Sequence, residues 1–296
     1  MTTARFPGNE AEALTRFIIF PLIAALALAG CIGAVNAPPA DPGLDLEAPT
    51  APRALNLSWG FTDCTAAIGL FPVQASKLKP FLPEGFRAHS FPEMGLPPDP
   101  RGDANLGLEA FTCKAGVGLN GTYEKAFYGS MFASVEPPAH LKDPAPGTMH
   151  FVKWDVLVHD EALRNALASL GVPAKAGSVG STVAKTPLGD GNLLSLDLTL
   201  DGKKFNFQTG GPASPLTGNF VEYTAVPGGL VKWTATFTGV TGNAPGTIAI
   251  DPASDAYKIA GSDRVQALFY QSTALTFKDG TITFVPAGTN ATAPAK

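Results

Sequence analysis

The sequence predicts a mostly β fold of the α+β class, with a few short helices and antiparallel strands that close into a barrel or pack as two sheets. Glycine and proline are abundant, at 32 and 27 of the 296 residues, which is typical of a turn-rich β protein. From residue 55 onward, apolar and polar residues alternate in runs bounded by turn residues, the pattern of half-buried strands. Hydrophobic residues make up 45% of the chain, enough to bury a real core.

The charge of the chain argues against nucleic acid as a partner. Only 16% of the residues are charged, the net charge is −4, and the basic residues form no block. Phosphate binding needs clustered lysine and arginine side chains. We therefore expect no nucleic-acid partner, and the sequence points to no particular protein partner.

The N-terminal segment predicts export. Residues 17–30 form an uncharged apolar run, FIIFPLIAALALAG, preceded by Arg5 and Arg16. The run is shorter than the roughly twenty residues that a spanning helix needs, and it is typical of an export signal. It ends in LAGC at Cys31, which resembles the lipobox of prokaryotic lipoproteins. The resemblance implies that residues 1–30 are removed and that Cys31 receives a membrane lipid. The alternative is an uncleaved signal anchor in which Cys31 is an ordinary thiol.

Either reading places the bulk of the chain at the extracytoplasmic face of the membrane, in the cell envelope. Residues 31–54 contain five prolines and no hydrophobic period, so we expect a semi-extended tether. The sequence shows no internal repeat and no second domain boundary, which predicts one domain over residues 55–288. Residues 289–296 are expected to be a frayed tail.

The two other cysteines, Cys64 and Cys113, predict a disulfide. An exported chain meets an oxidising compartment, where two leftover cysteines usually pair. The alternative is two buried free thiols that act as small hydrophobic side chains. No CxxC motif occurs, so the sequence offers neither a dithiol redox site nor a zinc knuckle.

The predicted strands follow one another through the domain. Alternating, β-branched or aromatic runs occupy residues 55–61, 67–73, 106–119, 123–138, 149–158, 192–210, 218–239 and 280–286. Two of the longer runs contain hairpin signals, DGKK after residue 200 and PGG after residue 226. These signals favour long antiparallel hairpins.

Two helices are expected among the strands. Residues 74–83 form a short candidate that begins after a proline. Residues 160–171 form a clearer one, because Asp160 can cap its start, its leucines and alanines make one apolar face, and Gly171 can end it. Residues 262–273 fit either a helix or a strand.

Three segments resemble the acetoacetate decarboxylase-like superfamily. GLFPVQASKLKPFLPEGF (69–86) resembles its opening strand, short helix and LPEGF-type turn. YEK (123–125) resembles its Tyr-x-Glu strand, with Glu124 one place early. DEALRNALASLGVPAKAG (160–177) resembles its helix that ends in Gly-aromatic-Pro-Lys-Lys. The resemblance covers roughly residues 55–185 and implies a closed, cone-like β-barrel.

The resemblance also implies a chemistry that this chain lacks in part. In that family a buried lysine attacks a ketone to form a Schiff base, and a second lysine depresses the pKa of the first amine. Aligned through Gly171 and Pro173, Ala174 stands where the first lysine is required, and only the second is present, as Lys175. We therefore expect no decarboxylation through a Schiff base.

The remaining candidates are carboxylates and histidines. Glu124 is the carboxylate nearest to the one that the family keeps inside its barrel, so Lys175 and Glu124 are the candidate catalytic residues. Other strand glutamates, Glu109, Glu136 and Glu222, would usually be solvated. The four histidines have no partner at metal-ligand spacing, so we expect neither a metal nor a cofactor. The histidines are His89, His140, His150 and His159, and sequons begin at Asn56, Asn120 and Asn290.

Three functions remain open. We favour an exported, membrane-anchored lipoprotein whose barrel binds a small apolar or carbonyl-bearing ligand, such as a keto acid, without turning it over. The second is a divergent decarboxylase-type lyase, or another enzyme, that uses Lys175 or Glu124. The third is a structural envelope protein with a packed barrel and no ligand. Whether an apolar cavity exists inside the barrel separates the first two from the third.

Overall fold

The computed structural model describes residues 57–118, 121–187, 191–211 and 214–287, which all lie in one compact unit. Several predicted features fall outside these ranges: the leader, Cys31 with its LAGC motif, the tether, the C-terminal tail and the sequons at Asn56, Asn120 and Asn290. Within the described ranges, every helix is too short or too polar to cross a membrane.

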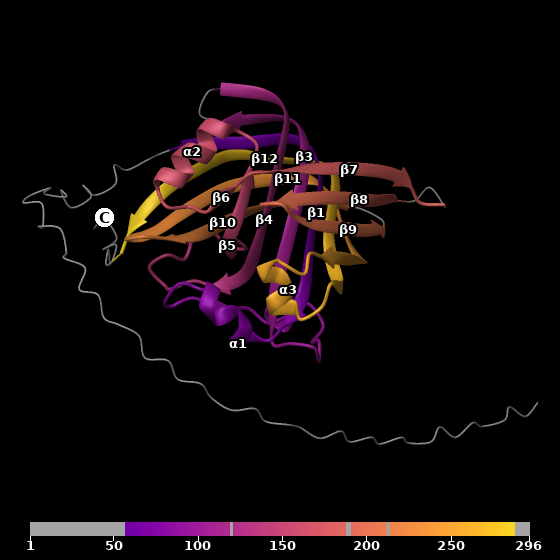
Figure 1. The fold of residues 1–296 in the computed structure, drawn as a ribbon, viewed down its shortest axis with the longest axis horizontal. Helices are drawn as coiled ribbons and strands as arrows, with labels where there is room; N and C mark the ends of the chain where they lie inside the picture. Colours follow the sequence, from indigo (N-terminus) through magenta and orange to yellow (C-terminus); the bar gives the residue numbers. More distant parts are fainter. Residues whose placement is uncertain (1–56, 119–120, 188–190, 212–213, 288–296) are drawn as a thin grey trace, which may run out of the picture. The chain divides into compact units, whose positions relative to one another are not determined.

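Strands make up most of the described chain, and the helices are short (Figure 1). The strands are β1 (Leu57–Val73), β2 (Arg87–Ala88), β3 (Ala104–Gly118), β4 (Gly121–Glu136), β5 (Met149–Val158), β6 (Ala174–Lys175), β7 (Gly177–Lys185), β8 (Asn192–Leu200), β9 (Lys203–Gly211), β10 (Ser214–Val226), β11 (Gly229–Ile250) and β12 (Arg264–Pro286). The helices are α1 (Ala75–Leu78), α2 (Glu161–Ser169) and α3 (Asp255–Ala260), with 3₁₀ turns η1 (Lys79–Phe81) and η2 (Pro92–Met94).

The long strands follow one another around a ring. Their hydrogen-bonded order is β10, β5, β4, β3, β1, β12 and β11, and β10 also pairs with β11. The predicted mostly β, barrel-like fold is therefore confirmed. The expectation that the strands are antiparallel is wrong at β5, which runs parallel to both β10 and β6. Parallel neighbours need a long connection, and α2 lies in the one between β5 and β6.

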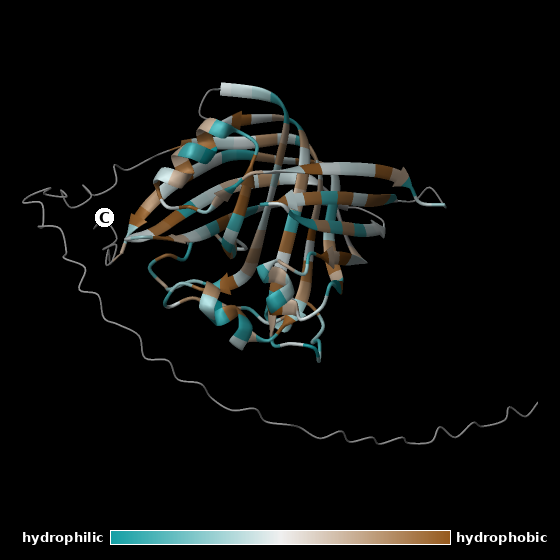
Figure 2. Cartoon of the chain, in the orientation of Figure 1, coloured by the Kyte–Doolittle hydropathy of each residue, from teal (hydrophilic) through white to brown (hydrophobic). Residues whose placement is uncertain are grey.

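Successive side chains point to opposite sides of a strand, and β3 and β4 are buried on both faces along much of their length. On β3, Glu109 and Phe111 line a cavity, whereas Leu108 and Ala110 belong to a cluster shared with β8 and β9. Figure 2 shows the resulting alternation of hydrophobic and more polar residues along the strands. The fold thus contains two apolar clusters on opposite faces of the same strands.

We call these clusters the inner core and the outer core. The inner core lies inside the ring and includes Trp59, Phe111, Tyr128, Phe220, Trp233 and Phe277. The outer core lies between the ring and the β7–β9 extension and includes Leu106, Leu108, Leu196, Leu198, Phe207 and Phe269.

The β7–β9 extension continues the sheet from β11 through β9 and projects to one side in Figure 1. It also covers β3 and β4. The hydroxyl oxygens of Thr112 on β3 and Ser181 on β7 are 2.8 Å apart. A Cβ added at Gly129 on β4 would lie only 2.9 Å from Leu198 Cδ1 on β8. Glycine therefore allows the extension to pack directly on the ring.

The clearest predicted helix forms as expected. Asp160 caps α2, accepting hydrogen bonds from the backbone nitrogens of Ala162 and Leu163 at 2.9 and 3.3 Å. Gly171, with a φ of 83°, follows the helix in the left-handed region. The buried residues of α2, Leu163 and Leu167, pack into the inner core.

The other local predictions are refined. The predicted helix over residues 74–83 is present as α1 followed by the η1 turn. The ambiguous segment 262–273 is mainly strand, since β12 begins at Arg264. The helix α3, which is short, capped by Ser254 and ended by Gly261, was not predicted from the sequence.

The predicted disulfide is present. Cys64 and Cys113 face each other across β1 and β3, and their sulfur atoms are bonded. Both residues are buried in the inner core. The bond therefore links two neighbouring ring strands beside the aromatic cluster.

Candidate functional site

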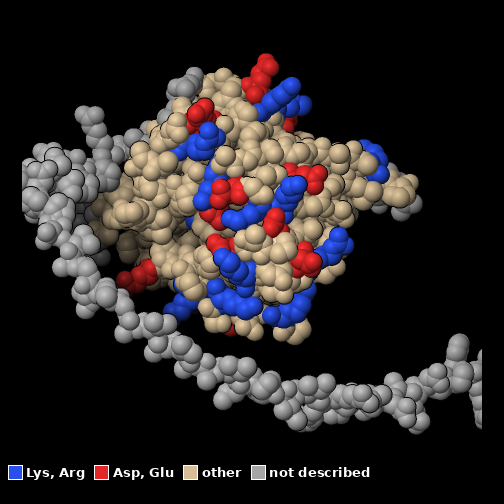
Figure 3. Space-filling model, viewed as in Figure 1, with Lys and Arg blue, Asp and Glu red and all other residues tan. Residues whose placement is uncertain are grey.

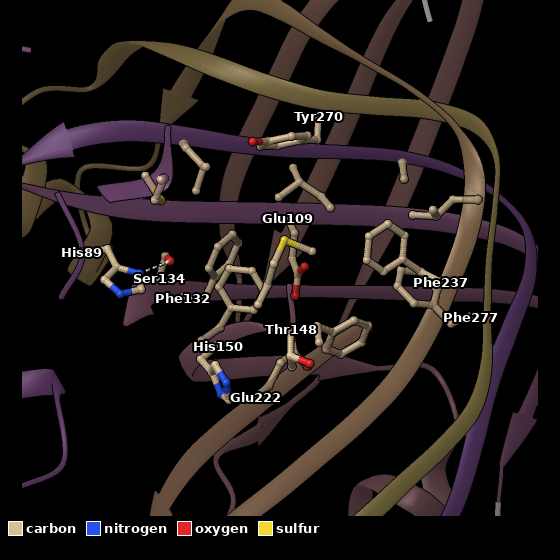
Figure 4. Close-up of a pocket in the computed structure, with 18 of the residues that line it drawn as sticks. His89, Glu109, Phe132, Ser134, Thr148, His150, Glu222, Phe237, Tyr270 and Phe277 are labelled. Carbon is tan, nitrogen blue, oxygen red and sulfur yellow. Dashed lines mark hydrogen bonds between the residues drawn. The ribbon is translucent and has the colours of Figure 1, made fainter. Parts of the chain in front are cut away.

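A cavity of about 370 Å³ lies inside the ring, within the usual size range of small-molecule sites. All the ring strands contribute to its wall. Most of the wall is apolar, and its aromatic residues are Trp59, Phe111, Tyr128, Phe132, Phe151, Phe220, Phe237, Tyr270 and Phe277. Figure 4 shows Glu109 between Phe132 on one side and Phe237 and Phe277 on the other.

Polar residues gather at one end, which we call the cavity mouth: His89, Glu93, Glu136, Lys142 and His150. His89 Nδ1 lies 3.1 Å from Ser134 Oγ, and its Nε2 lies 3.4 Å from Glu136 Oε2. Lys142 donates to Glu136 at 2.7 Å. The side chains of Glu136 and Lys142 are about half exposed, so this end of the cavity meets solvent.

His150 is the buried member of the mouth. Its Nδ1 lies 3.3 Å from the hydroxyl of Tyr223, which donates to the carbonyl oxygen of Leu141 at 2.7 Å. Burial lowers the pKa of His150, because desolvation disfavours the imidazolium. A neutral His150 is therefore expected near neutral pH.

Deeper in the ring lies a buried charge cluster made of Glu109, Tyr128, Ser130, Lys153 and Glu222. Lys153 Nζ contacts Glu222 Oε2 and the Tyr128 hydroxyl, and it lies 3.9 Å from Glu109 Oε1. Ser130 donates to Glu109 at 2.5 Å. Lys153 Nζ also lies 4.8 and 5.0 Å from the ring centroids of Tyr128 and Trp233. A buried ammonium is thus held by carboxylates and aromatic faces together.

The glutamates of this cluster line the cavity, whereas its lysine does not. Glu109 and Glu222 line the cavity, and their side chains are 7% and 8% exposed. The Lys153 side chain is 0% exposed and contributes nothing to the lining. Lys153 therefore acts as a counter-ion behind the carboxyl groups.

Burial controls the proton affinity of the cluster. Desolvation raises the pKa of Glu109 to about 7; the nearby Lys153 lowers it and the nearby Glu222 raises it further. Burial also raises the pKa of Glu222, against the opposing effect of Lys153. Burial also raises the pKa of Tyr128 well above its usual value. The cavity therefore offers a carboxyl group that exchanges a proton near neutral pH.

The two candidate catalytic residues lie elsewhere. Lys175 is on β6, where its Nζ lies 3.8 Å from Asp155 Oδ1 and 3.6 Å from Asp201 Oδ2. Glu124 is exposed on β4. Neither residue lines the cavity, and the structure does not bring them together with Lys153.

The sequence analysis left Glu109 and Glu222 as solvated strand residues and did not single out Lys153. One signal was available, because Glu109 shares its face of β3 with Phe111 and Glu222 shares its face of β10 with Phe220. A charge that shares a strand face with aromatic residues is a candidate for an inward position. Lys153 carries the same signal, because it shares its face of β5 with Phe151, which lines the cavity.

The described residues contain no group of three or more histidine, cysteine, aspartate or glutamate side chains placed to hold a metal ion. On the face seen in Figure 3, lysine and arginine side chains are interspersed with aspartate and glutamate. Such a surface differs from the single-sign patch that phosphate binding requires.

Comparisons with known proteins find similarity in structure alone. No family model matches the chain, and neither does any curated protein. The acetoacetate decarboxylase of Legionella pneumophila matches with a TM-score of 0.49 and 14% identity, over 81% of this chain and 91% of that one. An acetoacetate decarboxylase-like enzyme from Sphingomonas wittichii matches with a TM-score of 0.44 and 12% identity, over 78% and 93%.

The enduracididine biosynthesis enzyme MppR, in its complex with pyruvate, matches with a TM-score of 0.46 and 11% identity, over 80% of this chain and 93% of that one. The chain is therefore structurally similar to acetoacetate decarboxylase-like proteins. At these identities and TM-scores the matches assign no residue role here, so the function must be argued from the cavity.

Proposed function

We propose that the barrel binds a small apolar or carbonyl-bearing molecule without decarboxylating it through a Schiff base. One observation carries this proposal: an apolar, aromatic cavity of about 370 Å³ whose neighbouring lysine is shielded from it. Burial of apolar ligand surface supplies the affinity, and a few polar groups orient the ligand. Glu109 and Glu222 are the groups available for that orientation.

The cavity also weighs against a purely structural envelope protein. A barrel that serves only as a scaffold gains stability by filling its interior, because packing contacts are lost around a void. Here aromatic side chains surround the space without filling it. This arrangement supports a ligand site.

The lysines weigh against Schiff-base chemistry. An amine must reach the ketone carbon in its neutral form to attack it. Lys153 is occupied by Glu222 and Tyr128 and has no exposed side-chain surface, while Lys175 pairs with Asp155 and Asp201 away from the cavity. Both geometries favour an ion-pair role.

Titration of the full chain with N-phenylnaphthylamine, a neutral fluorescent probe of apolar sites, tests the binding proposal. We expect saturable binding that is lost in Ile68→Trp, because Ile68 lines the cavity and an indole there would occupy part of it. Val183→Trp is the matched control, since Val183 is 47% exposed and lies outside the cavity lining. Equal probe binding by both variants would remove the support for this site.

Incubation with acetoacetate and borohydride tests the chemistry. Borohydride reduces a Schiff base to a stable amine, so an adduct appears as added mass on one lysine. We expect no adduct on wild type. A substrate adduct at Lys153 or Lys175 would instead support the lyase alternative.

We further propose that the domain is exported and anchored through lipid on Cys31. The support is the uncharged run over residues 17–30 followed by LAGC. Mass spectrometry of the membrane fraction should find a chain that starts at Cys31 with added lipid. Cys31→Ser should release the domain or leave the leader attached. A chain in the membrane that starts at unmodified Met1 would rule this proposal out.

A further inference from the structure

We propose that the ligand is an apolar cation, with a single ammonium group held by Glu109, Glu222 and the surrounding aromatic rings. This inference rests on the proposed function, because it needs the cavity to bind a ligand. It adds the charge of that ligand, which neither the fold nor the family resemblance indicates.

The charges of the buried cluster do not balance. Two carboxyl groups face one ammonium, so full ionisation leaves one negative charge without a partner inside the ring. The acids at the mouth are already paired. Glu93 contacts Arg87 at 2.7 Å, and Glu136 contacts Lys142 at 2.7 Å. The unbalanced charge therefore lies deep in the cavity.

A ligand in the cavity would lie next to the two glutamates. The side chains of Glu109 and Glu222 line the cavity, while that of Lys153 is fully buried and does not. A ligand carboxylate would approach two acids at low dielectric with the one nearby cation shielded, which is unfavourable. A ligand ammonium would complete the charge balance.

The aromatic lining of the cavity also favours a cation. Aromatic faces attract cations, most strongly when water is excluded. Phe111 and Phe277 stack at 5.3 Å beside Tyr128, which stacks on Phe111 at 5.6 Å. Lys153 already lies over the rings of Tyr128 and Trp233. The interior is thus built to stabilise positive charge.

Proton linkage separates a cation from a neutral carbonyl ligand. Glu109 has a pKa of about 7. A cation favours the ionised carboxylate, so its binding releases protons and strengthens as pH rises through this range. A carbonyl oxygen instead needs a protonated carboxyl as donor, so its binding weakens as pH rises.

Other titratable groups surround Glu109 and the cavity mouth. Glu109 is faced by Tyr128 on β4, Lys153 on β5 and Glu222 on β10. Those at the mouth are His89, Glu93, Glu136, Lys142 and His150. A variant of Glu109 is therefore needed to show that the pH dependence of binding comes from Glu109 and not from the histidines.

The test uses three ligands of similar size on the full chain. Benzyltrimethylammonium is permanently charged, neopentylbenzene is its neutral isostere, and benzylacetone is a neutral ketone. Each is titrated calorimetrically at about pH 5.5 and about pH 8. We expect the affinity of the cation to rise about tenfold or more between these values, because one carboxyl that titrates near 7 controls it. The affinity of the isostere should stay constant.

Glu109→Gln keeps the size and the hydrogen-bonding capacity of the side chain but removes its charge. We expect it to weaken cation binding about tenfold at pH 8, to abolish the pH dependence and to leave the isostere unchanged. Glu124→Gln is the matched control, because Glu124 is exposed and outside the cavity lining. If Glu109→Gln fails to fold, the test is made on wild type, by calorimetric titration in buffers of different ionisation enthalpy. We then expect net release of protons when the cation binds.

The outcomes distinguish this inference from the proposed function. If neopentylbenzene binds as tightly as the cation at pH 8, the cavity is a ligand site but the cation inference is wrong. If benzylacetone binds most tightly and weakens as pH rises, the polar end of the ligand is a carbonyl. If neither these ligands nor N-phenylnaphthylamine binds, both proposals fail.

Discussion

The inner and outer cores use opposite faces of the same strands, yet they are built differently. The outer core is mainly aliphatic, with leucines from β3 and β8 meeting Phe207 and Phe269. The inner core is mainly aromatic, encloses a cavity and contains Lys153 with two glutamates. Only the inner core leaves room for a ligand, and only the inner core has charged side chains that such a ligand could contact.

The difference shows how one sheet can separate stability from function. Branched aliphatic side chains interdigitate and fill space, so the outer core anchors the β7–β9 extension. Rigid aromatic rings that line the inside of a barrel leave a void that neighbouring side chains cannot fill. Buried charges cost desolvation energy and persist only where they are paired. The cavity and the buried charges of the inner core thus lower the stability of the fold but form a possible ligand site.

The largest expected effect compares one phenylalanine from each core. Phe207 is fully buried in the outer core, so Phe207→Ala should destabilise the fold by about 4 kcal/mol. Phe277 already borders the cavity, so Phe277→Ala should cost about 2 kcal/mol but weaken probe binding. Denaturant unfolding and N-phenylnaphthylamine titration measure the two effects. Equal stability losses would show that the two cores are packed alike.

Lys153→Met should destabilise the protein by about 3 kcal/mol at pH 8, because it leaves Glu109 and Glu222 buried without a counter-charge. The loss should shrink at about pH 5, where the two carboxyl groups take up protons. Urea midpoints at both pH values measure this. Lys175→Met, which removes a lysine outside the cavity, is the control. A pH-independent loss would mean that Lys153 contributes packing rather than charge.

The pH dependence of the wild-type protein has a defined sign. The pKa of Glu109 is raised from 4.5 to about 7 in the folded state, so the native protein binds more protons than the unfolded chain between these values. Stability should therefore fall, by up to about 3 kcal/mol, as pH rises from about 4.5 to about 7, and then level off. Glu109→Gln should flatten this part of the curve. An unchanged curve in that variant would assign the titration to another group.

Loss of the disulfide should have a smaller effect. The double variant Cys64→Ala with Cys113→Ala should lose about 2 kcal/mol, at the low end for removal of a native disulfide, because the domain is large and β1 and β3 remain paired. Thiol labelling of the unfolded, unreduced wild type should find neither of these cysteines free. Labelling of both would show that the bond does not form.

The smallest effects are expected at Lys175 and Glu124, the catalytic residues predicted from the sequence. Lys175→Ala removes ion pairs of a side chain that is 30% exposed, and Glu124→Gln changes an exposed strand residue. Each should change stability by less than about 1 kcal/mol and leave probe binding intact. Loss of ligand binding in either variant would show that Lys175 on β6 or Glu124 on β4 contributes to the ligand site.

Much of the local structure follows from the sequence because its signals are local. Asp160 and Gly171 mark the ends of α2, alternation marks the long strands, and the expectation of export predicts that Cys64 and Cys113 pair. Each inference needs only neighbouring residues or the compartment. The family resemblance and the observed ring of strands agree on a mostly β, barrel-like fold.

Tertiary structure alone decided which charges share a site. Alternation tells that Glu109, Glu124 and Glu222 lie on strand faces, but not whether a face meets solvent or the interior of a ring. The parallel pairing of β5 with β10 brings Lys153 to Glu222, and the order of β3, β4 and β5 brings Glu109 to the same ammonium. These neighbours are set by long-range pairing and ring closure, which no local sequence period encodes.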